Sequence, residues 1–145
     1  MDTISLCMIV KNEEKNIAGC IISAKDIIDE IIIVDTGSTD KTKEVAKEIC
    51  KKFRLGVKFF DFKWDDDFSA ARNESIRHAT KDWILVLDAD EILDDEGIKA
   101  IKDLVKGKEN DAFLFLQKNY TNEPSIAGFV NEERKKDNQT YLGWY

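Results

Sequence analysis

Three acidic residues follow directly after an apolar run at residues 83–87: Asp88, Asp90 and Glu91. Successive side chains of an extended chain point to opposite sides, so Asp88 and Asp90 are expected to point the same way. Carboxylates this close repel one another, and some must take up protons unless a cation lies between them. Oxygen ligands suit Mg²⁺ or Mn²⁺, which commonly bind one or two carboxylates together with substrate phosphates. We therefore expect a divalent metal here. The alternative is that the acids are solvated or cap the next helix.

Arg72 is the second residue that indicates chemistry. It falls in the middle of the apolar face of a helix expected over residues 68–79. The apolar members of that face are Phe68, Ala71, Ile76 and Ala79. A guanidinium group cannot lose its charge, so a buried one needs an anionic partner. The sequence leaves two partners open, namely a carboxylate of the acidic group, as a structural ion pair, or a ligand phosphate.

Polar residues also follow two earlier apolar runs. The run at residues 4–10 precedes Asn12, Glu13 and Glu14, which we expect to cap a helix and fill its first turn.

The second run, at residues 30–34, is rich in isoleucine and ends at Asp35. Gly37 lies in the polar turn that follows, where glycine permits unusual backbone angles. The sequence thus predicts a third acid-bearing strand end.

The fold must bring these residues together. Strand-like runs and helical patterns alternate four times, and a further strand is expected at residues 112–116. This order predicts a Rossmann-like three-layer α/β/α domain with a mostly parallel sheet and right-handed crossovers. In such sheets ligands bind beyond the carboxyl ends of the strands. The three polar strand ends should therefore share one crevice, although no GxGxxG dinucleotide motif is present.

Composition limits the classes of function. The 145 residues suffice for one ordinary domain, and the net charge of −7 argues against non-specific nucleic-acid binding. No apolar run approaches the ~18 residues of a membrane span, and no secretory signal is visible. The three cysteines, Cys7, Cys20 and Cys50, lie in apolar patterns without CxxC spacing and are expected to be reduced, in a cytoplasmic protein.

Four segments together resemble the family 2 glycosyltransferases with the GT-A fold. In order, they are Cys7-Met8-Ile9-Val10-Lys11-Asn12-Glu13-Glu14, Ile33-Val34-Asp35-Thr36-Gly37-Ser38-Thr39-Asp40-Lys41-Thr42, Ala71-Arg72-Asn73 and Leu87-Asp88-Ala89-Asp90-Glu91. Any one motif is weak evidence, whereas four in matching order and spacing are strong. The resemblance covers roughly the first two-thirds of the chain. It implies a transferase that uses a nucleotide-sugar donor, most commonly a UDP-sugar, with Mn²⁺ or Mg²⁺.

The resemblance also implies roles for individual residues. Asp35 would accept a hydrogen bond from uracil, Asp88 would lie near the ribose, and Asp90 would bind the metal that bridges the phosphates. The nucleotide-binding set implied in this way is Val10, Asn12, Glu13, Asp35, Gly37, Arg72, Asn73, Asp88 and Ala89. Where many members have Pro-x-Tyr, this chain has Ile9-Val10-Lys11, which leaves the contacts at the first strand end open.

Two other functions stay open at this point. A haloacid dehalogenase-type phosphotransferase also places Asp-x-Asp after a buried strand, but there Gly-Thr follows the second Asp, whereas Glu91-Ile92 follows here. A non-catalytic module that binds nucleotide or metal for a partner would carry the same acids. The acceptor, whether saccharide, lipid or protein, cannot be deduced from the sequence.

The end of the chain suggests a domain that continues. Residues 1–117 are expected to form the nucleotide-sugar-binding domain, and residues 118–145 a polar tail or the start of an acceptor-side part. An inverting transferase needs a general base near the acceptor hydroxyl. Glu123, Glu132 and Glu133 lie in a polar setting that does not fix a carboxylate. We therefore expect the base beyond residue 145, and a chain that binds donor without transferring sugar.

Overall fold

The computed structural model describes residues 2–106, 112–115, 119–121 and 140–142. The chain divides into two units, residues 1–109 and residues 110–145. In the second unit two short strands, β5 (Asn119–Thr121) and β6 (Thr140–Leu142), pair antiparallel. The predicted strand at residues 112–116 is not formed at residues 112–115, so that prediction was wrong; the apolar residues there have no neighbouring ladder among the described strands.

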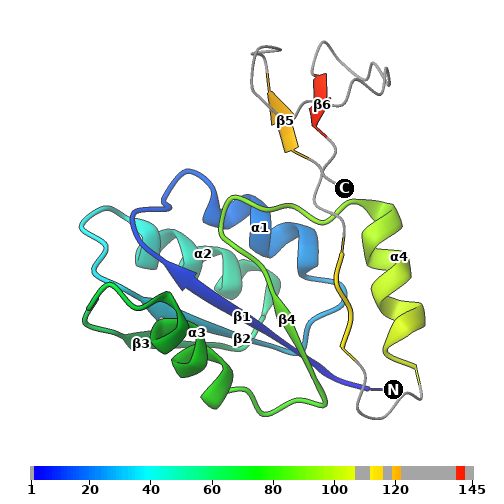
Figure 1. Ribbon diagram of the computed structural model, residues 1–145, viewed down its shortest axis with the longest axis horizontal. Helices are drawn as coiled ribbons and strands as arrows, with labels where there is room; N and C mark the ends of the chain where they lie inside the picture. The colour runs from blue at the N-terminus through cyan, green and yellow to red at the C-terminus, as the bar shows by residue number, and fades with distance from the viewer. Residues whose placement is uncertain (1, 107–111, 116–118, 122–139, 143–145) are drawn as a thin grey trace. The chain divides into compact units, whose positions relative to one another are not determined.

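The first unit is built on a four-stranded sheet in the order β3-β2-β1-β4, with every pairing parallel (Figure 1). Its strands are β1 (Ile4–Val10), β2 (Glu30–Asp35), β3 (Val57–Asp61) and β4 (Trp83–Val86). Its helices are α1 (Ile17–Ala24), α2 (Thr42–Phe53), α3 (Phe68–Arg77) and α4 (Asp95–Leu104). The predicted α/β architecture with a parallel sheet is confirmed.

Helices cover both faces of the centre of this sheet. The alternation of side chains along β1 sends Leu6 and Met8 into the main core with α1 and α2, while the Cys7 thiol donates to the Ser75 carbonyl of α3 at 3.5 Å. In Figure 1, α3 lies in front of the strands and α1 and α2 lie behind them. β1 and β2 are therefore buried on both faces, which fits their largely apolar sequences.

The apolar run at residues 83–87 predicts a strand buried on both faces, but β4 is buried on one face only. Leu85 and Leu87 join the main core, whereas Ile84 and Val86 are 42% and 43% exposed. Within the described chain β4 is an edge strand of the sheet, and α3 packs over β1 and β2. An apolar run alone did not reveal whether a helix covers each face.

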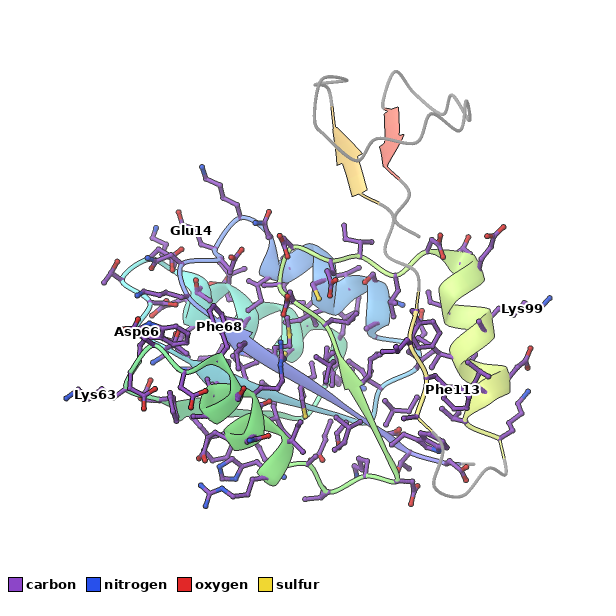
Figure 2. The ribbon with its side chains drawn as sticks, in the orientation of Figure 1. Glu14, Lys63, Asp66, Phe68, Lys99 and Phe113 are labelled. Carbon is purple, nitrogen blue, oxygen red and sulfur yellow. The ribbon has the colours of Figure 1, made fainter. Side chains whose placement is uncertain are left out.

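Two helices differ from expectation. α1 begins at Ile17 with no acidic residue in its first turn, so Asn12 is not its cap. On α3 the buried residues are Ala71 and Ser75, while Phe68 is 69% exposed and lies near the carboxyl end of β1 (Figure 2). The inner face of α3 is thus rotated from the predicted one, because polar Ser75 is buried through its bond to the Arg72 carbonyl.

The three cysteines are free and buried, and burial raises the pKa of Cys20 to about 12. Their predicted reduced state fits this placement, and the cytoplasmic location stays a prediction. Among the residues that the structure describes, no helix combines the length and hydrophobicity that spanning a bilayer requires.

A buried carboxylate joins the strands at the amino end of the sheet. Glu30 accepts hydrogen bonds from the Ser5 hydroxyl at 2.6 Å, the Thr80 amide at 2.6 Å and the Lys58 ammonium at 3.0 Å. Burial by itself raises the pKa of Glu30, but these donors together outweigh it and lower the pKa to about 2. Glu30 thereby connects β1, β2, β3 and the segment before β4.

Replacing Glu30 should change how stability depends on pH. The folded-state pKa lies below the unfolded value, so the ionised carboxylate stabilises the fold above about pH 4.5, and this contribution disappears as the pH falls toward 2. We expect Glu30→Gln to cost about 2–3 kcal/mol at pH 7 and progressively less below pH 4.5. Urea unfolding at several pH values measures this. Glu48→Gln, an exposed change on α2, is the control, and a constant difference between Glu30→Gln and wild type at all pH values would contradict the assignment.

Candidate functional site

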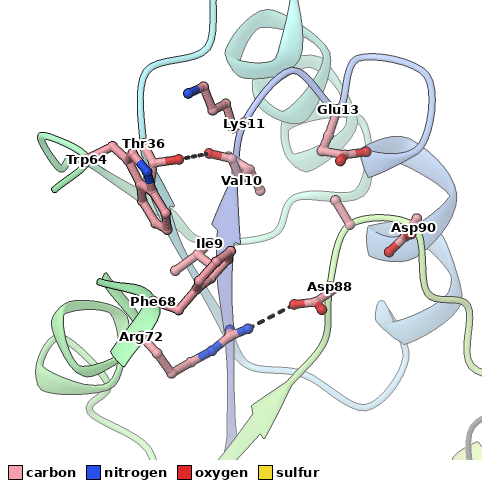
Figure 3. A pocket seen from close by; sticks show the side chains of 11 residues that line it. Ile9, Val10, Lys11, Glu13, Thr36, Trp64, Phe68, Arg72, Asp88 and Asp90 are labelled. Atoms are coloured by element: carbon pink, nitrogen blue, oxygen red, sulfur yellow. Dashed lines mark hydrogen bonds and ion pairs between the residues drawn. The ribbon is translucent and has the colours of Figure 1, made fainter. Parts of the chain in front are cut away.

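A pocket of about 360 Å³ opens at the carboxyl ends of the strands (Figure 3). Its apolar lining comes from Ile9, Val10, Trp64, Phe68 and Ala89. Its polar lining comes from Lys11, Glu13, Thr36, Arg72, Asp88 and Asp90. The parallel register that sets Val10 beside Asp35 explains why these segments meet here. The predicted crevice at the strand ends is therefore present, and its size suits a small-molecule ligand.

The acidic motif after β4 presents its two aspartates to the pocket. Leu87 and Ala89 are buried, while Asp88 and Asp90 are exposed and line the pocket. Both aspartates thus face the pocket as expected, but Asp90 does so from a turn, in which the Glu91 amide donates to the Asp88 carbonyl at 3.0 Å, and not from an extended chain. Glu91 has a structural role, since its carboxylate accepts from the Asp88 amide at 2.7 Å and closes the turn.

Arg72 reaches from α3 to the acidic motif. One nitrogen donates to the Asp88 carboxylate at 2.8 Å and another to the Cys7 carbonyl at 3.4 Å. Its side chain is 24% exposed and that of Asp88 is 60% exposed. The partner is thus a carboxylate of the acidic motif, one of the two alternatives, and the pair still faces the pocket where a ligand could contact it.

A clamp of hydrogen bonds holds the loop after β1 against the loop after β2. Asn12 has a φ of 57°, its amide donates to the Ser38 hydroxyl at 2.9 Å, and its side-chain oxygen accepts from the Thr39 amide at 2.8 Å. The Glu13 amide donates to the Thr42 hydroxyl at 2.7 Å. Asn12 therefore holds the loop that presents Lys11 and Glu13, and is not itself a lining residue of the pocket.

Asp35 lies beneath the pocket rather than on its surface. Its residue is 1% exposed, and its Oδ1 accepts from the amides of Gly37 and Ser38, each at 2.7 Å. Gly37 has a φ of 105°, so the turn needs the glycine, as expected. The buried Oδ2 has no hydrogen-bond partner among the described residues, and the Lys43 ammonium stands 3.9 Å away.

The remaining predicted site residues divide between the pocket and its surroundings. Val10 lines the pocket, and its carbonyl accepts from the Thr36 amide at 2.9 Å and hydroxyl at 3.2 Å. Asn73 is exposed on α3 and is not a lining residue. The nucleotide contacts assigned to Asn12, Gly37 and Asn73 stay predictions.

Four lining residues were given no ligand role from the sequence, namely Ile9, Lys11, Trp64 and Phe68. Thr36, in contrast, follows Asp35 at a strand end that was expected in the crevice. Phe68 was assigned to the inner face of its helix. The available signal was the pair of aromatic residues that flank Asp65-Asp66-Asp67, since such side chains are costly to expose without a use.

The residues fit a metal shared with a ligand rather than a complete protein cage. No set of three or more His, Cys, Asp or Glu residues in the described chain is arranged to hold an ion. Asp90, however, is exposed at the pocket, and no described residue forms an ion pair with it. Mg²⁺ and Mn²⁺ often bind through one or two carboxylates completed by phosphate oxygens and water, so Asp90 is suited to such an ion.

Comparison with protein families decides the identity of the chain. The model of Glycosyl transferase family 2 matches residues 5–140. The chain belongs to glycosyl transferase family 2. A TPR repeat-containing protein of Synechococcus elongatus is 45% identical over 117 residues, which cover 81% of this chain and 28% of that protein. The glycosyltransferase SunS encoded by the SPbeta prophage of Bacillus subtilis is 43% identical over 94 residues, 65% of this chain and 21% of that protein.

Solved structures agree with this family 2 assignment at the level of the fold. Staphylococcus aureus TarS 1–349, crystallised with UDP-GlcNAc, matches with a TM-score of 0.61 at 22% identity, over 71% of this chain and 31% of that chain. The mannosyltransferase PcManGT from Pyrobaculum calidifontis, in complex with GDP-Man and Mn²⁺, matches with a TM-score of 0.61 at 22% identity, over 73% and 33%. These neighbours have the GT-A fold, as expected.

Membership of family 2 excludes one of the alternative functions, and the matched relatives are much longer than this chain. A haloacid dehalogenase-type phosphotransferase is excluded, because the family model spans nearly the whole chain. The family 2 chain covers 28% and 21% of the length of the two relatives named above.

The pair between Arg72 and Asp88 yields a prediction that separates binding from stability. Because Asp88 is largely exposed, we expect Arg72→Met to change the free energy of unfolding by about 1 kcal/mol or less. The same change should weaken UDP binding about tenfold or more, since the guanidinium is the cation nearest to the acidic motif. Calorimetry and thermal unfolding measure the two effects.

Arg77→Met is the matched control, because Arg77 lies on the same helix, is 69% exposed and pairs with Glu74 outside the pocket. Equal UDP affinity for the two variants would contradict a role for Arg72 in binding. A large loss of stability in Arg72→Met alone would make its role structural.

Proposed function

We propose that this chain binds a nucleotide-sugar donor, with a UDP-sugar as the first candidate, for inverting transfer of the sugar to an acceptor. The observation that carries the proposal is the pocket at the strand ends in which Arg72, Asp88 and Asp90 meet, within a family 2 chain. The pocket combines an apolar wall with charged groups, as a ligand with a flat base and a charged diphosphate requires.

A divalent ion resolves the charge problem of such a pocket. A diphosphate that entered alone would meet the carboxylates of Glu13, Asp88 and Asp90 in a chain of net charge −7. We propose that Asp90 binds Mn²⁺ or Mg²⁺ together with the phosphate oxygens, the Asp-x-Asp role expected from the sequence. When bound, the ion neutralises charge on the leaving diphosphate.

In this proposal Asp88 contacts the ribose of the nucleotide and Arg72 contacts a phosphate. One oxygen of Asp88 is held by Arg72, and a ribose hydroxyl can donate to a carboxylate fixed in this way. Arg72 still lines the pocket and can donate to a phosphate. The unpartnered Oδ2 of buried Asp35 is an acceptor that an N–H of the base could satisfy if the turn at residues 36–38 moves aside.

The solved neighbours support the class of donor. TarS was crystallised with UDP-GlcNAc and PcManGT with GDP-Man and Mn²⁺, so both a uridine and a guanosine donor occur on this fold. We place UDP first because it is the commonest donor nucleotide of the family that the motifs resemble.

None of the carboxylates that line the pocket is free to act as the general base, because each has another role in this proposal. Asp88 pairs with Arg72, Asp90 is assigned to the metal, and Glu13 accepts from the Asn16 amide group at 2.9 Å. A general base for the acceptor hydroxyl must therefore come from elsewhere. We propose that it lies outside this chain; Glu123, Glu132 and Glu133 fall outside the described residues.

Removal of the metal tests the donor site. We expect EDTA to lower UDP affinity by a factor of ten or more, because the diphosphate would then face the carboxylates directly. Asp90→Asn should bind UDP poorly even with excess Mn²⁺. Asp65→Asn removes the same charge from an exposed residue that does not line the pocket, and should bind UDP like wild type. Calorimetry that gives one affinity for all four conditions would refute the proposal.

Turnover tests where the base lies. With UDP-sugars, Mn²⁺ and mixed acceptors, we expect the 145-residue chain to bind donor but to release no UDP in response to acceptor. A coupled UDP-release assay measures this. Robust acceptor-dependent release would overturn the placement of the base outside the chain, without affecting the donor site.

A further inference from the structure

The two walls of the pocket differ in chemistry. In Figure 3, Asp88 and Asp90 lie on one side of the pocket, and Trp64, Phe68 and Arg72 lie on the other. Trp64 and Phe68 form an aromatic wall there, next to the Arg72 guanidinium, which donates across the pocket to Asp88. The rings come from the loop after β3 and from the first residue of α3. A ligand that fills both sides must be charged at one end and flat or apolar at the other.

The one polar group of Trp64 is bonded within its own loop. Its indole N–H, the only donor of the side chain, donates to the Asp66 carboxylate at 2.8 Å. Asp66 has a φ of 62°, a left-handed conformation that Asp tolerates better than most residues. The indole N–H is thus satisfied within the loop, so a ligand would contact Trp64 through the apolar part of its ring.

Phe68 braces that ring. The two ring centroids lie 4.7 Å apart with an interplanar angle of 77°, so Phe68 and Trp64 meet edge to face. Asp67 accepts from the Ala70 amide at 3.0 Å and fixes the start of α3, and with it the position of Phe68. Phe68 is nevertheless 69% exposed, an uncommon exposure for a phenylalanine that serves only the core.

We propose that Trp64 is the nucleobase-stacking residue of this donor site, with Phe68 as the positioning residue that holds its ring. This inference rests on the proposed function and adds the recognition of the base to it. With the diphosphate near Asp90, the base of the same nucleotide extends to the aromatic wall. Every base offers a flat π-face, so this contact strengthens binding of uridine and guanosine nucleotides alike. The choice between bases then falls to polar groups such as Thr36 and Lys11.

Binding measurements with Mg²⁺ test the assignment. Trp64→Leu should weaken UDP and GDP about tenfold or more, by similar factors, and leave inorganic pyrophosphate unchanged. Trp64→Phe keeps an aromatic face and should restore most of the affinity. Unchanged UDP affinity in Trp64→Leu overturns the inference. A loss of affinity confined to UDP-sugars also overturns it, because the ring would then contact the sugar. An equal loss of affinity for pyrophosphate overturns it too, because the substitution would then have damaged the whole pocket.

Intrinsic fluorescence gives a second readout that does not depend on Trp64→Leu folding. The chain has three tryptophans. We expect UDP to quench the emission of wild type and of Trp83→Phe, because Trp83 begins β4 at the other end of the strand. Trp64→Phe should bind UDP without that quenching, and quenching that persists in this variant overturns the inference.

The outcomes for wild type separate the two proposals. If wild type binds none of UDP, GDP and pyrophosphate, the proposed donor-binding function itself fails. If wild type binds all three and Trp64 proves irrelevant, only the stacking assignment fails.

Discussion

Parallel pairing of β1 along both of its edges is the constraint on which the site depends. The register sets Val10 beside Asp35 on one side and Cys7 beside Val86 on the other. β4 ends at Val86, so Asp88 follows at the same edge of the sheet as Asp35, where the Arg72 guanidinium contacts both Asp88 and the Cys7 carbonyl. A slip of one residue would turn Asp88 toward the core and its apolar neighbours toward the pocket. The sheet therefore determines both where the acids lie and which way they point.

The same register also gathers unequal numbers of acidic and basic side chains at the pocket. Three carboxylates and two cations, Lys11 and Arg72, line the pocket, which leaves a surplus of negative charge. One carboxylate is already paired, through Asp88 and Arg72. Asp90 is left without a cation among the described residues, and a metal ion bound with a diphosphate would supply one. The proposed function therefore predicts that the pocket binds a metal complex of a nucleotide more tightly than the free anion.

Much of this site could be predicted from sequence because its parts follow strand ends. Asp35 and Asp88 each end or follow an apolar run, and a parallel sheet brings such ends together. Arg72 could be predicted to have an anionic partner because a guanidinium near an apolar helix face needs one.

Other features depend on tertiary contacts that spacing does not encode. Asn12 resembled a helix cap, but its amide and side chain bind the loop after β2 instead. Trp64 lines the pocket from a loop in which Asp66 adopts a left-handed conformation and accepts from the indole N–H, and no pattern in the sequence indicated this. The exposed face of β4 escaped prediction because periodicity cannot tell which faces a helix covers.

The central claim is that the carboxyl ends of the strands form a metal-dependent nucleotide site, and amide NMR tests it most directly. On titration of the ¹⁵N-labelled chain with UDP and Mg²⁺, the account predicts shift changes at residues 9–13, 36–38, 64–72 and 88–91. Replacement of Mg²⁺ by Mn²⁺ should broaden signals most strongly around Asp90. Shift changes centred instead on Thr3, Asp29, Thr80 and Asp82, at the amino end of the sheet, would contradict the account.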